Sequence, residues 1–426
     1  MIARPGLGPR CLLVGFTMFV IMTSATVPSA LYALWAKAYG FGPLTVTVIF
    51  SIYVAGVVFG LMGLGGWSDA LGRRPMLVAA VAACALSDIG YLFSRNLAML
   101  IIARLVSGLA TGLIAGTATA TMVDLAPPNL RVRASMTALA CNMGGLTAGP
   151  VLGGVFAEYG VKPMHLVYAV HLILLAVVVA VPLFAVPPRA RNREARLRPI
   201  GLMVPPEVRA EFWPAAMGGG LGFAVGGLLN AVAGLYLGHL AGIHNPFLAG
   251  LMVAPCFGLI ALGQLLSPRL PERSRLPLCC AGLIFSLVLI MVALAFTQTA
   301  LLVISGLVVG ISTGLAIGHG MASINTHCPA EHRGATNSTF FAVMYVGLSV
   351  PVIGAGIAMQ QIGLRAGGEI FSAVVGVIIV GIGVVLLAGM GRPVARPTPV
   401  LIQPPLPRLP AGIRVVSAPG PRTPVG

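Results

Sequence analysis

Residues 65–75 read GGWSDALGRRP and join two apolar stretches, residues 43–64 and 76–93. Each stretch is long enough to cross a bilayer, which takes about 20 apolar residues. A connection this short makes the two helices antiparallel neighbours, so the charges between them gather at one membrane face. The residues that stand out in it are an acid, a turn glycine and two arginines: Asp69, Gly72, Arg73 and Arg74.

The composition around this loop is that of a membrane protein. Of the 426 residues, 58% are hydrophobic and 8% are charged, and the mean hydropathy is +0.98. A water-exposed surface needs far more charge, so lipid must surround most of the chain. Apolar spans are predicted at residues 11–35, 43–64, 76–93, 97–122, 136–157, 163–186, 212–238, 247–266, 276–296, 300–324, 337–359 and 368–388.

The net charge of +16 follows this topology. Twenty-one of the 26 lysines and arginines lie near the N-terminus, in alternate loops and in the C-terminal tail. Four lie in loops of the opposite face, and Arg104 lies inside a span. This asymmetry is the positive-inside rule, so no nucleic-acid partner is needed to explain the charge. It predicts a multi-pass membrane protein with both termini in the cytoplasm.

The loop resembles the G-x-x-x-D-x-x-G-R-R motif between helices 2 and 3 of the major facilitator superfamily of secondary transporters. Gly65 is its first glycine, and Ala70 replaces the basic residue that usually follows the acid. The resemblance implies an all-α membrane protein of twelve transmembrane helices in two pseudo-symmetric halves. It also implies that Asp69, Arg73 and Asp124 form a charge latch with the start of helix 11, near residues 337–338. The alternative is a plain membrane anchor with an incidental salt bridge.

An internal repeat supports two halves. Residues 105–116 read LVSGLATGLIAG and residues 307–318 read LVVGISTGLAIG, so seven of twelve positions agree at an offset of 202. The loop counterpart after helix 8, residues 263–269, lacks the acid. We expect a six-helix bundle at residues 1–186, a cytoplasmic linker at 187–211, a second bundle at 212–389, and a disordered Pro/Arg-rich tail at 390–426.

The fifth span contains the sequence GLTAGPVLGG at residues 145–154. Proline kinks a helix and glycine allows close approach of a neighbour. The pattern resembles the G-x-x-x-G-P-x-x-G-G signature found mainly in the proton-coupled exporters of the superfamily, although ordinary small-residue packing is the alternative. Its positions are Gly145, Gly149, Pro150, Gly153 and Gly154.

Two charges lie inside spans. Arg104 costs about 2.5–3.5 kcal/mol there on insertion scales, so it should face a cavity or a partner, and it aligns with a family arginine linked to proton movement. Asp88 lies roughly 7 Å deep and Arg104 roughly 10 Å deep from the same face. They could therefore pair, and Asp88 could carry a proton. A fixed ion pair, or an acid that reaches the headgroups, is the alternative.

The first span carries no acid, unlike that of many drug/proton antiporters, which makes a neutral or anionic substrate easier to accommodate than a cation. Polar residues of other spans are candidates for the cavity lining: Tyr32, Asn142, Asn230, Tyr236 and His319. Each of them could equally be a packing residue. The seven cysteines show no metal-ligand spacing and are read as reduced packing residues.

No phosphate-binding loop, zinc spacing or nucleophile motif is present, so the chain is expected to be neither an enzyme nor an ATP-driven pump. We predict proton-coupled efflux of a small molecule by a monomer, without a cofactor and with the proton gradient as energy source. Two alternatives stay open. One is an uptake symporter for a sugar or organic acid, and the other is a membrane sensor or scaffold that transports nothing.

Overall fold

The computed structural model describes residues 7–64, 66–188, 201–329 and 331–390, except for the side chains of residues 69, 389 and 390. Within these ranges all regular structure is helical, and twelve segments are long and apolar enough to cross a membrane. The N-terminal half contains α1 (Pro9–Thr26), α3 (Pro43–Val58), α5 (Arg73–Leu92), α6 (Leu97–Leu125), α7 (Arg131–Tyr159) and α8 (Leu166–Val178). The C-terminal half contains α9 (Pro206–His239), α10 (Pro246–Leu266), α11 (Glu272–Phe296), α12 (Thr299–His327), α13 (Arg333–Ile362) and α14 (Leu364–Met390).

These bounds confirm the twelve predicted spans, although the form of three of them is irregular. The second and sixth spans end in π-helical turns at Phe59–Gly63 and Val181–Ala185. The first span is broken: α1 ends at Thr26, a 3₁₀ turn covers Val27–Ala30, and α2 (Tyr32–Tyr39) follows. Pro28 has no N–H to continue the helical bonding, and the Ser29 hydroxyl donates to the Thr26 carbonyl at 2.6 Å. The chain therefore has a jointed first helix.

The domain limits differ slightly from those expected. Helix α9 begins at Pro206, so the last residues of the predicted linker are helical. Pro206 is suited to this place because a proline in the first turn loses no helical hydrogen bond. Residues 189–200 of the linker and 391–426 of the tail lie outside the described residues.

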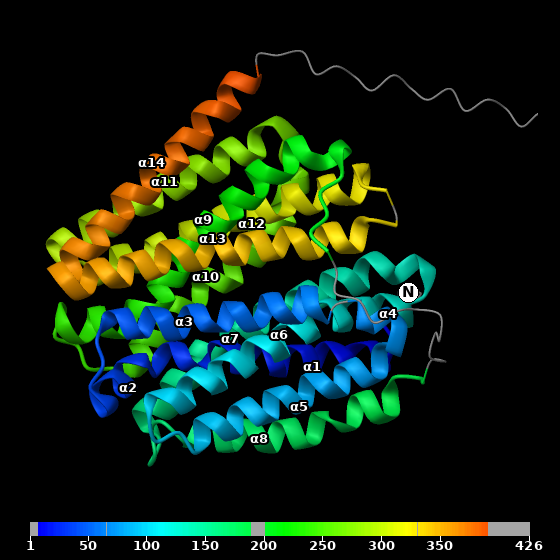
Figure 1. Cartoon of the computed structure of the whole chain (residues 1–426), viewed down its shortest axis with the longest axis horizontal. Helices are drawn as coiled ribbons and strands as arrows, with labels where there is room; N and C mark the ends of the chain where they lie inside the picture. Colours follow the sequence, from blue (N-terminus) through cyan, green and yellow to red (C-terminus); the bar gives the residue numbers. More distant parts are fainter. Residues whose placement is uncertain (1–6, 65, 189–200, 330, 391–426) are drawn as a thin grey trace, which may run out of the picture.

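The helices form two bundles that lie side by side: α1 to α8 make up one, and α9 to α14 the other (Figure 1). Across the seam between them, α7 packs against α10, α3 packs against α13, and α9 contacts α2 and α3. The end of the molecule that carries α4 (Trp67–Leu71) is called the α4 end, and the opposite end, beside α2, is called the α2 end (Figure 1).

The internal repeat appears as repeated packing. Gly108 and Gly112 of α6 lie against the backbone of α3, and Gly310 and Gly314 of α12 lie against the backbone of α10. Side chains at these four positions would hold the helices apart. The Ser87 hydroxyl donates to Ala103 across α5 and α6 at 2.8 Å, and Ser286 donates to Ser305 across α11 and α12 at 3.1 Å.

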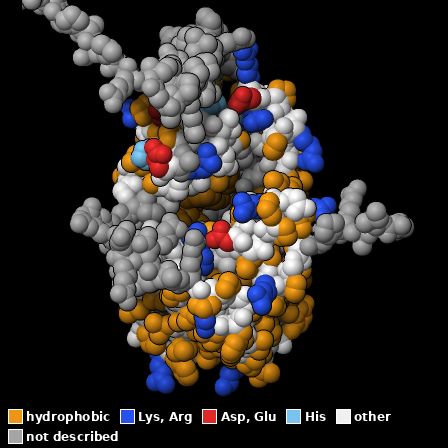
Figure 2. Space-filling view, turned by 90° about the vertical axis from the view of Figure 1, so that its right-hand side faces the viewer, with side chains coloured by type: hydrophobic (Ala, Val, Ile, Leu, Met, Phe, Trp, Pro, Cys, Tyr) orange, Lys and Arg blue, Asp and Glu red, His pale blue; other side chains and the backbone are white. Residues whose placement is uncertain are grey.

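The two halves meet most closely toward the α2 end. Gly356 of α13 lies against Thr47 of α3, and Gly250 of α10 lies against the Pro150 carbonyl of α7. The view onto the α4 end shows a recess between the two halves, with Lys and Arg side chains around it (Figure 2). The molecule is therefore tightly closed at the α2 end and hollowed at the α4 end.

Candidate functional site

The loop at the α4 end contains a real ion pair. Arg73 lies at the start of α5, and its Nε is 3.4 Å from Asp124 Oδ2 near the end of α6. Arg73 also donates from NH1 to the Ser68 hydroxyl at 2.7 Å. Gly72 turns the chain between α4 and α5 with φ +98°, a conformation that favours glycine. The expected pairing of the third span (α5) with the end of the fourth span (α6) is therefore present.

The structure describes only part of the predicted latch. Gly65 and the Asp69 side chain lie outside the described residues. Arg74 follows Arg73 in the first turn of α5. At the start of α13, the buried Asn337 Oδ1 has no hydrogen-bond partner among the described residues. The latch stays a prediction.

The glycine–proline motif of α7 forms a joint with the first helix. Gly145 lies against Phe19 and Met22, Gly149 against Thr26, and Gly153 against the Val27 carbonyl. On the adjoining face, a Cβ added to Gly154 would come within 2.8 Å of the Phe247 Cα at the start of α10. One motif thus contacts both the break in the first helix and the other half of the molecule.

Pro150 makes this joint specific. Because Pro150 has no N–H, the carbonyl four residues earlier, that of Leu146, loses its helical donor. The Thr26 hydroxyl donates to this carbonyl at 2.9 Å. The last residue of α1 therefore satisfies a group that the kink in α7 leaves open.

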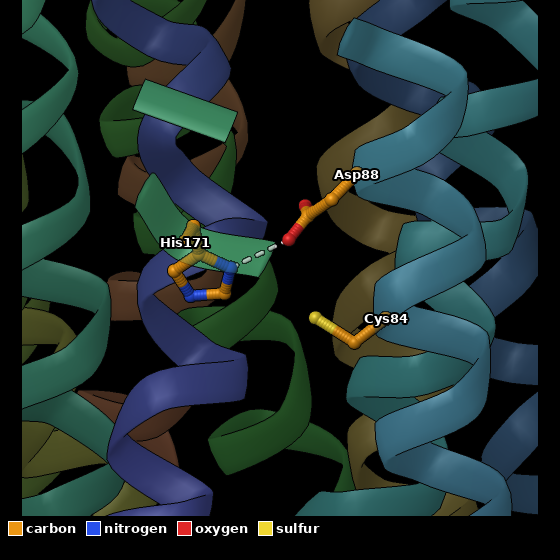
Figure 3. Close-up of side chains that lie close together, drawn as sticks. All are labelled: Cys84, Asp88 and His171. Atoms are coloured by element: carbon orange, nitrogen blue, oxygen red, sulfur yellow. Dashed lines mark hydrogen bonds and ion pairs between the residues drawn. The ribbon is translucent and has the colours of Figure 1, made fainter. Parts of the chain in front are cut away.

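A buried polar cluster joins α1, α5 and α8 behind this joint. His171 of α8 contacts Asp88 of α5 with 2.5 Å between Nδ1 and Oδ2, as Figure 3 shows. The Ser24 hydroxyl of α1 donates to the other carboxyl oxygen at 2.6 Å. His171 Nε2 lies 2.9 Å from the Val20 carbonyl, also in α1. Asp88 is fully buried and the His171 side chain is 6% exposed.

The protonation of this pair follows from its partners. A carbonyl only accepts, so Nε2 of His171 must carry a proton to bond Val20. Two bare lone pairs would repel at 2.5 Å, so a second proton lies between Nδ1 and Oδ2. With that proton the Asp88–His171 pair is neutral overall, whichever of the two groups holds it. Without it, an uncompensated negative charge would be buried.

Cys84 lies one helical turn from Asp88 and faces the same pair (Figure 3). Its sulfur, the carboxylate and the imidazole all offer ligand atoms within 4.8 Å of one another. Tetrahedral Zn²⁺ would hold a nitrogen and an oxygen ligand roughly 3.4 Å apart. The 2.5 Å contact therefore fits a shared proton and leaves no room for an ion between the two groups.

Arg104 is 1% exposed and does not pair with Asp88, which contradicts the expected ion pair. Its NH1 donates to the Ala25 carbonyl at 2.6 Å, and its guanidinium carbon lies 4.5 Å from the centre of the Tyr53 ring. The two charges differ in direction: Asp88 turns toward α8, whereas Arg104 turns toward α1 and α3. A similar depth in the membrane did not imply contact between the two side chains.

The residues predicted to line a cavity share one property. Tyr32, Asn230, Tyr236 and His319 are buried, and each has a side-chain polar atom without a hydrogen-bond partner among the described residues. Asn142 is half-buried. Four further buried side chains were not predicted from the sequence: His171, Trp35, Tyr91 and Tyr168. A histidine inside the sixth span was the available signal for His171.

A separate apolar groove of about 690 Å³ runs between α7 and α10, beside α1. Small side chains of both halves line it, among them Gly144, Ala148 and Gly258.

Comparison with known proteins agrees with this architecture. The family model described as Major Facilitator Superfamily matches residues 13–351, and the chain belongs to that family of membrane transporters, which are carriers and not enzymes.

Among its curated relatives, a class E tetracycline resistance protein of Escherichia coli is 31% identical over 115 residues, which are 27% of this chain and 28% of that protein. The 4-hydroxybenzoate transporter PcaK of Pseudomonas aeruginosa is 30% identical over 152 residues, 35% of this chain and 33% of that protein. The matched segments thus span about a quarter to a third of these relatives.

Solved structures resemble the chain over most of its length. A bacterial homologue of the human lysosomal transporter Spinster superposes with a TM-score of 0.68 at 15% identity, covering 89% of this chain and 96% of that one. A D-xylose–proton symporter superposes with a TM-score of 0.69 at 13% identity, covering 87% and 96%. At these identities the likeness concerns the fold.

Proposed function

We propose that this transporter is a proton-coupled exporter of a small molecule that works by alternating access. The observation that carries the proposal is the joint between Pro150 and Thr26. At this joint the exporter-type motif of α7 holds the break in the first helix on one side and α10 on the other. A rocking motion of the halves must pass through this contact.

Coupling to protons is assigned to Asp88 and His171. They form a buried pair that holds one proton, and both are bonded to α1, the helix that meets the glycine–proline motif. Loss of the proton would bury a net negative charge, which is costly in a low-dielectric interior. The pair would therefore release its proton only together with a rearrangement of α1. No cofactor is needed for this cycle.

The recess at the α4 end (Figure 2) suits loading from the cytoplasm, given the orientation that the positive-inside rule predicts. Export also agrees with the tetracycline resistance proteins among the relatives. We place the protein in the bacterial inner membrane, with small-molecule substrate, protons and lipid as its partners and no nucleic acid. It is proposed to act as a monomer.

Everted membrane vesicles energised with a proton gradient test this proposal. Radiolabelled tetracycline and 4-hydroxybenzoate are suitable first candidates, because relatives carry these names. Accumulation inside the vesicles that collapses with a protonophore supports export. Uptake by whole cells, without accumulation in the vesicles, would contradict export and indicate import.

Import is the second candidate function. PcaK, whose name describes a 4-hydroxybenzoate transporter, matches a segment of this chain about as well as the tetracycline proteins do. Both directions use the same fold and the same proton site. The vesicle experiment separates them, since only the direction of accumulation differs.

A further inference from the structure

Arg104 is a buried cation without a counter-ion. No carboxylate of the described residues lies within 4.0 Å of it, and Asp88, an acid of the neighbouring helix α5, is neutralised by His171. Its Nε has no hydrogen-bond partner. A charge in a membrane interior is expensive unless it is paired. The interior of the N-terminal half therefore has an unmet requirement for an anion.

The groups around Arg104 also favour an anion, because they include hydrogen-bond donors. Arg104 lies over the rings of Tyr32 and Tyr53, and Trp35 follows Tyr32 one turn later in α2. The Trp35 indole N–H is buried without a partner, and the Tyr32 hydroxyl, which has no well-formed hydrogen bond, interacts with Arg104. Guanidinium and indole groups only donate. Such a set is complementary to a carboxylate, which only accepts.

Aromatic rings form the walls of this site. Trp35 stacks on Tyr91 with 5.7 Å between ring centres, and Tyr91 stacks on Tyr168 at 4.7 Å. The Tyr168 hydroxyl is buried without a partner, and the Tyr91 hydroxyl, which has no well-formed hydrogen bond, interacts with Arg104. Offset stacking accommodates a further ring of similar size. The walls therefore favour a ligand whose body is aromatic.

The second half contributes Asn230 of α9. Gly227 lies against Phe50 and Gly234 against Ala33, so this face of α9 packs on the N-terminal half. Asn230 lies between the two glycines on the same face by helical periodicity. Phe50 is also within 5.9 Å of the Arg104 guanidinium. Both amide atoms of Asn230 are buried and unpartnered, so they can bind a ligand held by Arg104.

We infer that Arg104, Tyr32, Trp35 and Asn230 form the binding site for an aromatic carboxylate, which supplies the missing counter-ion of Arg104. This inference rests on the proposed function and names its substrate class. The carboxylate would take the free donors of the N-terminal half, and Asn230 would bind from the other half. Ligand binding would then bring the two halves together. The break at Val27–Ala30 lets α2 move to admit the ligand, because it separates Tyr32 from the segment that Arg104 holds.

Trp35 is a built-in reporter for the test. The chain has three tryptophans, so a Trp67→Phe/Trp213→Phe protein in detergent reports on Trp35 alone. Three probes separate charge from shape: benzoate, its neutral analogue benzamide, and cyclohexanecarboxylate, which lacks the aromatic ring. Benzoate is expected to change Trp35 fluorescence saturably. Benzamide should bind roughly ten- to hundredfold more weakly, as for a lost charged hydrogen bond, and cyclohexanecarboxylate should also bind more weakly.

Arg104→Gln in the same background should abolish the benzoate response. Arg95→Gln is the matched control, because Arg95 is exposed in the loop just before α6 and loses the same charge. Because Arg104 has no counter-ion, Arg104→Gln should also keep or raise the Tm of the ligand-free protein. A purely structural arginine would give a lower Tm.

The inference is overturned if wild-type protein gives no saturable benzoate response, if benzamide binds as well as benzoate, or if Arg104→Gln binds benzoate normally. Its failure is distinct from failure of the proposed function. Benzoate binding without gradient-driven export in vesicles would contradict proton-coupled export alone. Export of another compound that is unaffected by Arg104→Gln would contradict the aromatic carboxylate site alone.

Discussion

At the scale of single residues, the chemistry is concentrated in two buried charges that do not touch. Asp88 has His171 as its partner, and Arg104 has a backbone carbonyl and aromatic rings. Separation gives each charge its own ligand: a proton for the first and, as inferred above, an anion for the second. A direct Asp88–Arg104 pair would have satisfied both and left nothing to bind.

Asp88→Asn tests the proton site. The asparagine amide can still donate to His171 Nδ1 while Nε2 keeps its bond to Val20, so the local geometry is preserved. Transport driven by a pH gradient should fall to background, while exchange of substrate between equal pools should continue. Radiolabelled substrate in proteoliposomes measures both, with whichever compound the vesicle screen identifies.

His171→Gln should give the same uncoupling. His165→Gln is the matched control, because His165 lies at the α2 end of the same helix and bonds the Leu92 carbonyl instead. The other titratable groups near the pair are Cys84, Tyr91 and Tyr168. Gradient-driven accumulation that survives in both Asp88→Asn and His171→Gln would contradict the assignment.

At the scale of elements, the bond from Thr26 to the Leu146 carbonyl is the most specific contact between helices. Thr26→Val leaves that carbonyl buried and unsatisfied, which should lower the free energy of unfolding by about 1–3 kcal/mol. Thermal unfolding in detergent measures this as a lower Tm. Thr17→Val is the control, because Thr17 bonds a carbonyl within its own helix that already has a helical donor.

The double variant Thr26→Val/Pro150→Ala sharpens this prediction. Alanine at 150 restores the N–H that Leu146 lacks, so part of the stability lost in Thr26→Val should return. Transport should still be impaired, because the kink is gone. If the double variant instead loses the sum of the stability losses of Thr26→Val and Pro150→Ala, the Thr26 hydroxyl does not satisfy the Leu146 carbonyl.

The elements also show what the sequence can predict. Hydropathy placed all twelve spans, because lipid imposes a length and composition on each crossing helix. The charges Arg73 and Asp124 were correctly paired because a short loop and a helix end share one membrane face. The break at Val27 was missed: a proline in a span kinks some helices and breaks others, depending on which neighbours satisfy the freed groups.

The candidate site was only partly predictable for a related reason. Composition identified Asp88, Arg104, Tyr32 and Asn230 as unusual residues of spans, and all are buried. The residue number gives the depth of a side chain along its helix. It does not give the direction in which that side chain points around the helix axis. Contact between α5 and α8 depends on that rotation, so the partnership of Asp88 with His171 required the structure.

At the scale of the whole molecule, the predicted latch at the α4 end would have to break and reform in each transport cycle. Asp69→Asn is predicted to abolish transport while the amount of protein in the membrane is unchanged, because the predicted latch would lose its acid. Glu158→Gln, at the α2 end of α7, is the control. Transport assays with immunoblots of the membrane fraction measure both quantities. Full activity of Asp69→Asn would contradict the latch.

The repeat makes the two halves equal in shape and unequal in charge. The counterpart of Arg104 at the offset of 202 is Gly306, and the buried Asp88–His171 pair also lies in the N-terminal half. Under the proposed function, the N-terminal half would respond to protons and the C-terminal half would follow it.

The segment from Val20 to Ala25 has a practical consequence. His171, Asp88 and Arg104, from three different helices, all hold this one short stretch of α1, which ends in the turn at Val27–Ala30. An inhibitor wedged against that turn would immobilise both buried sites at once, without resembling either a proton donor or a substrate. A drug screen directed at this chain would gain most from compounds that stiffen the turn.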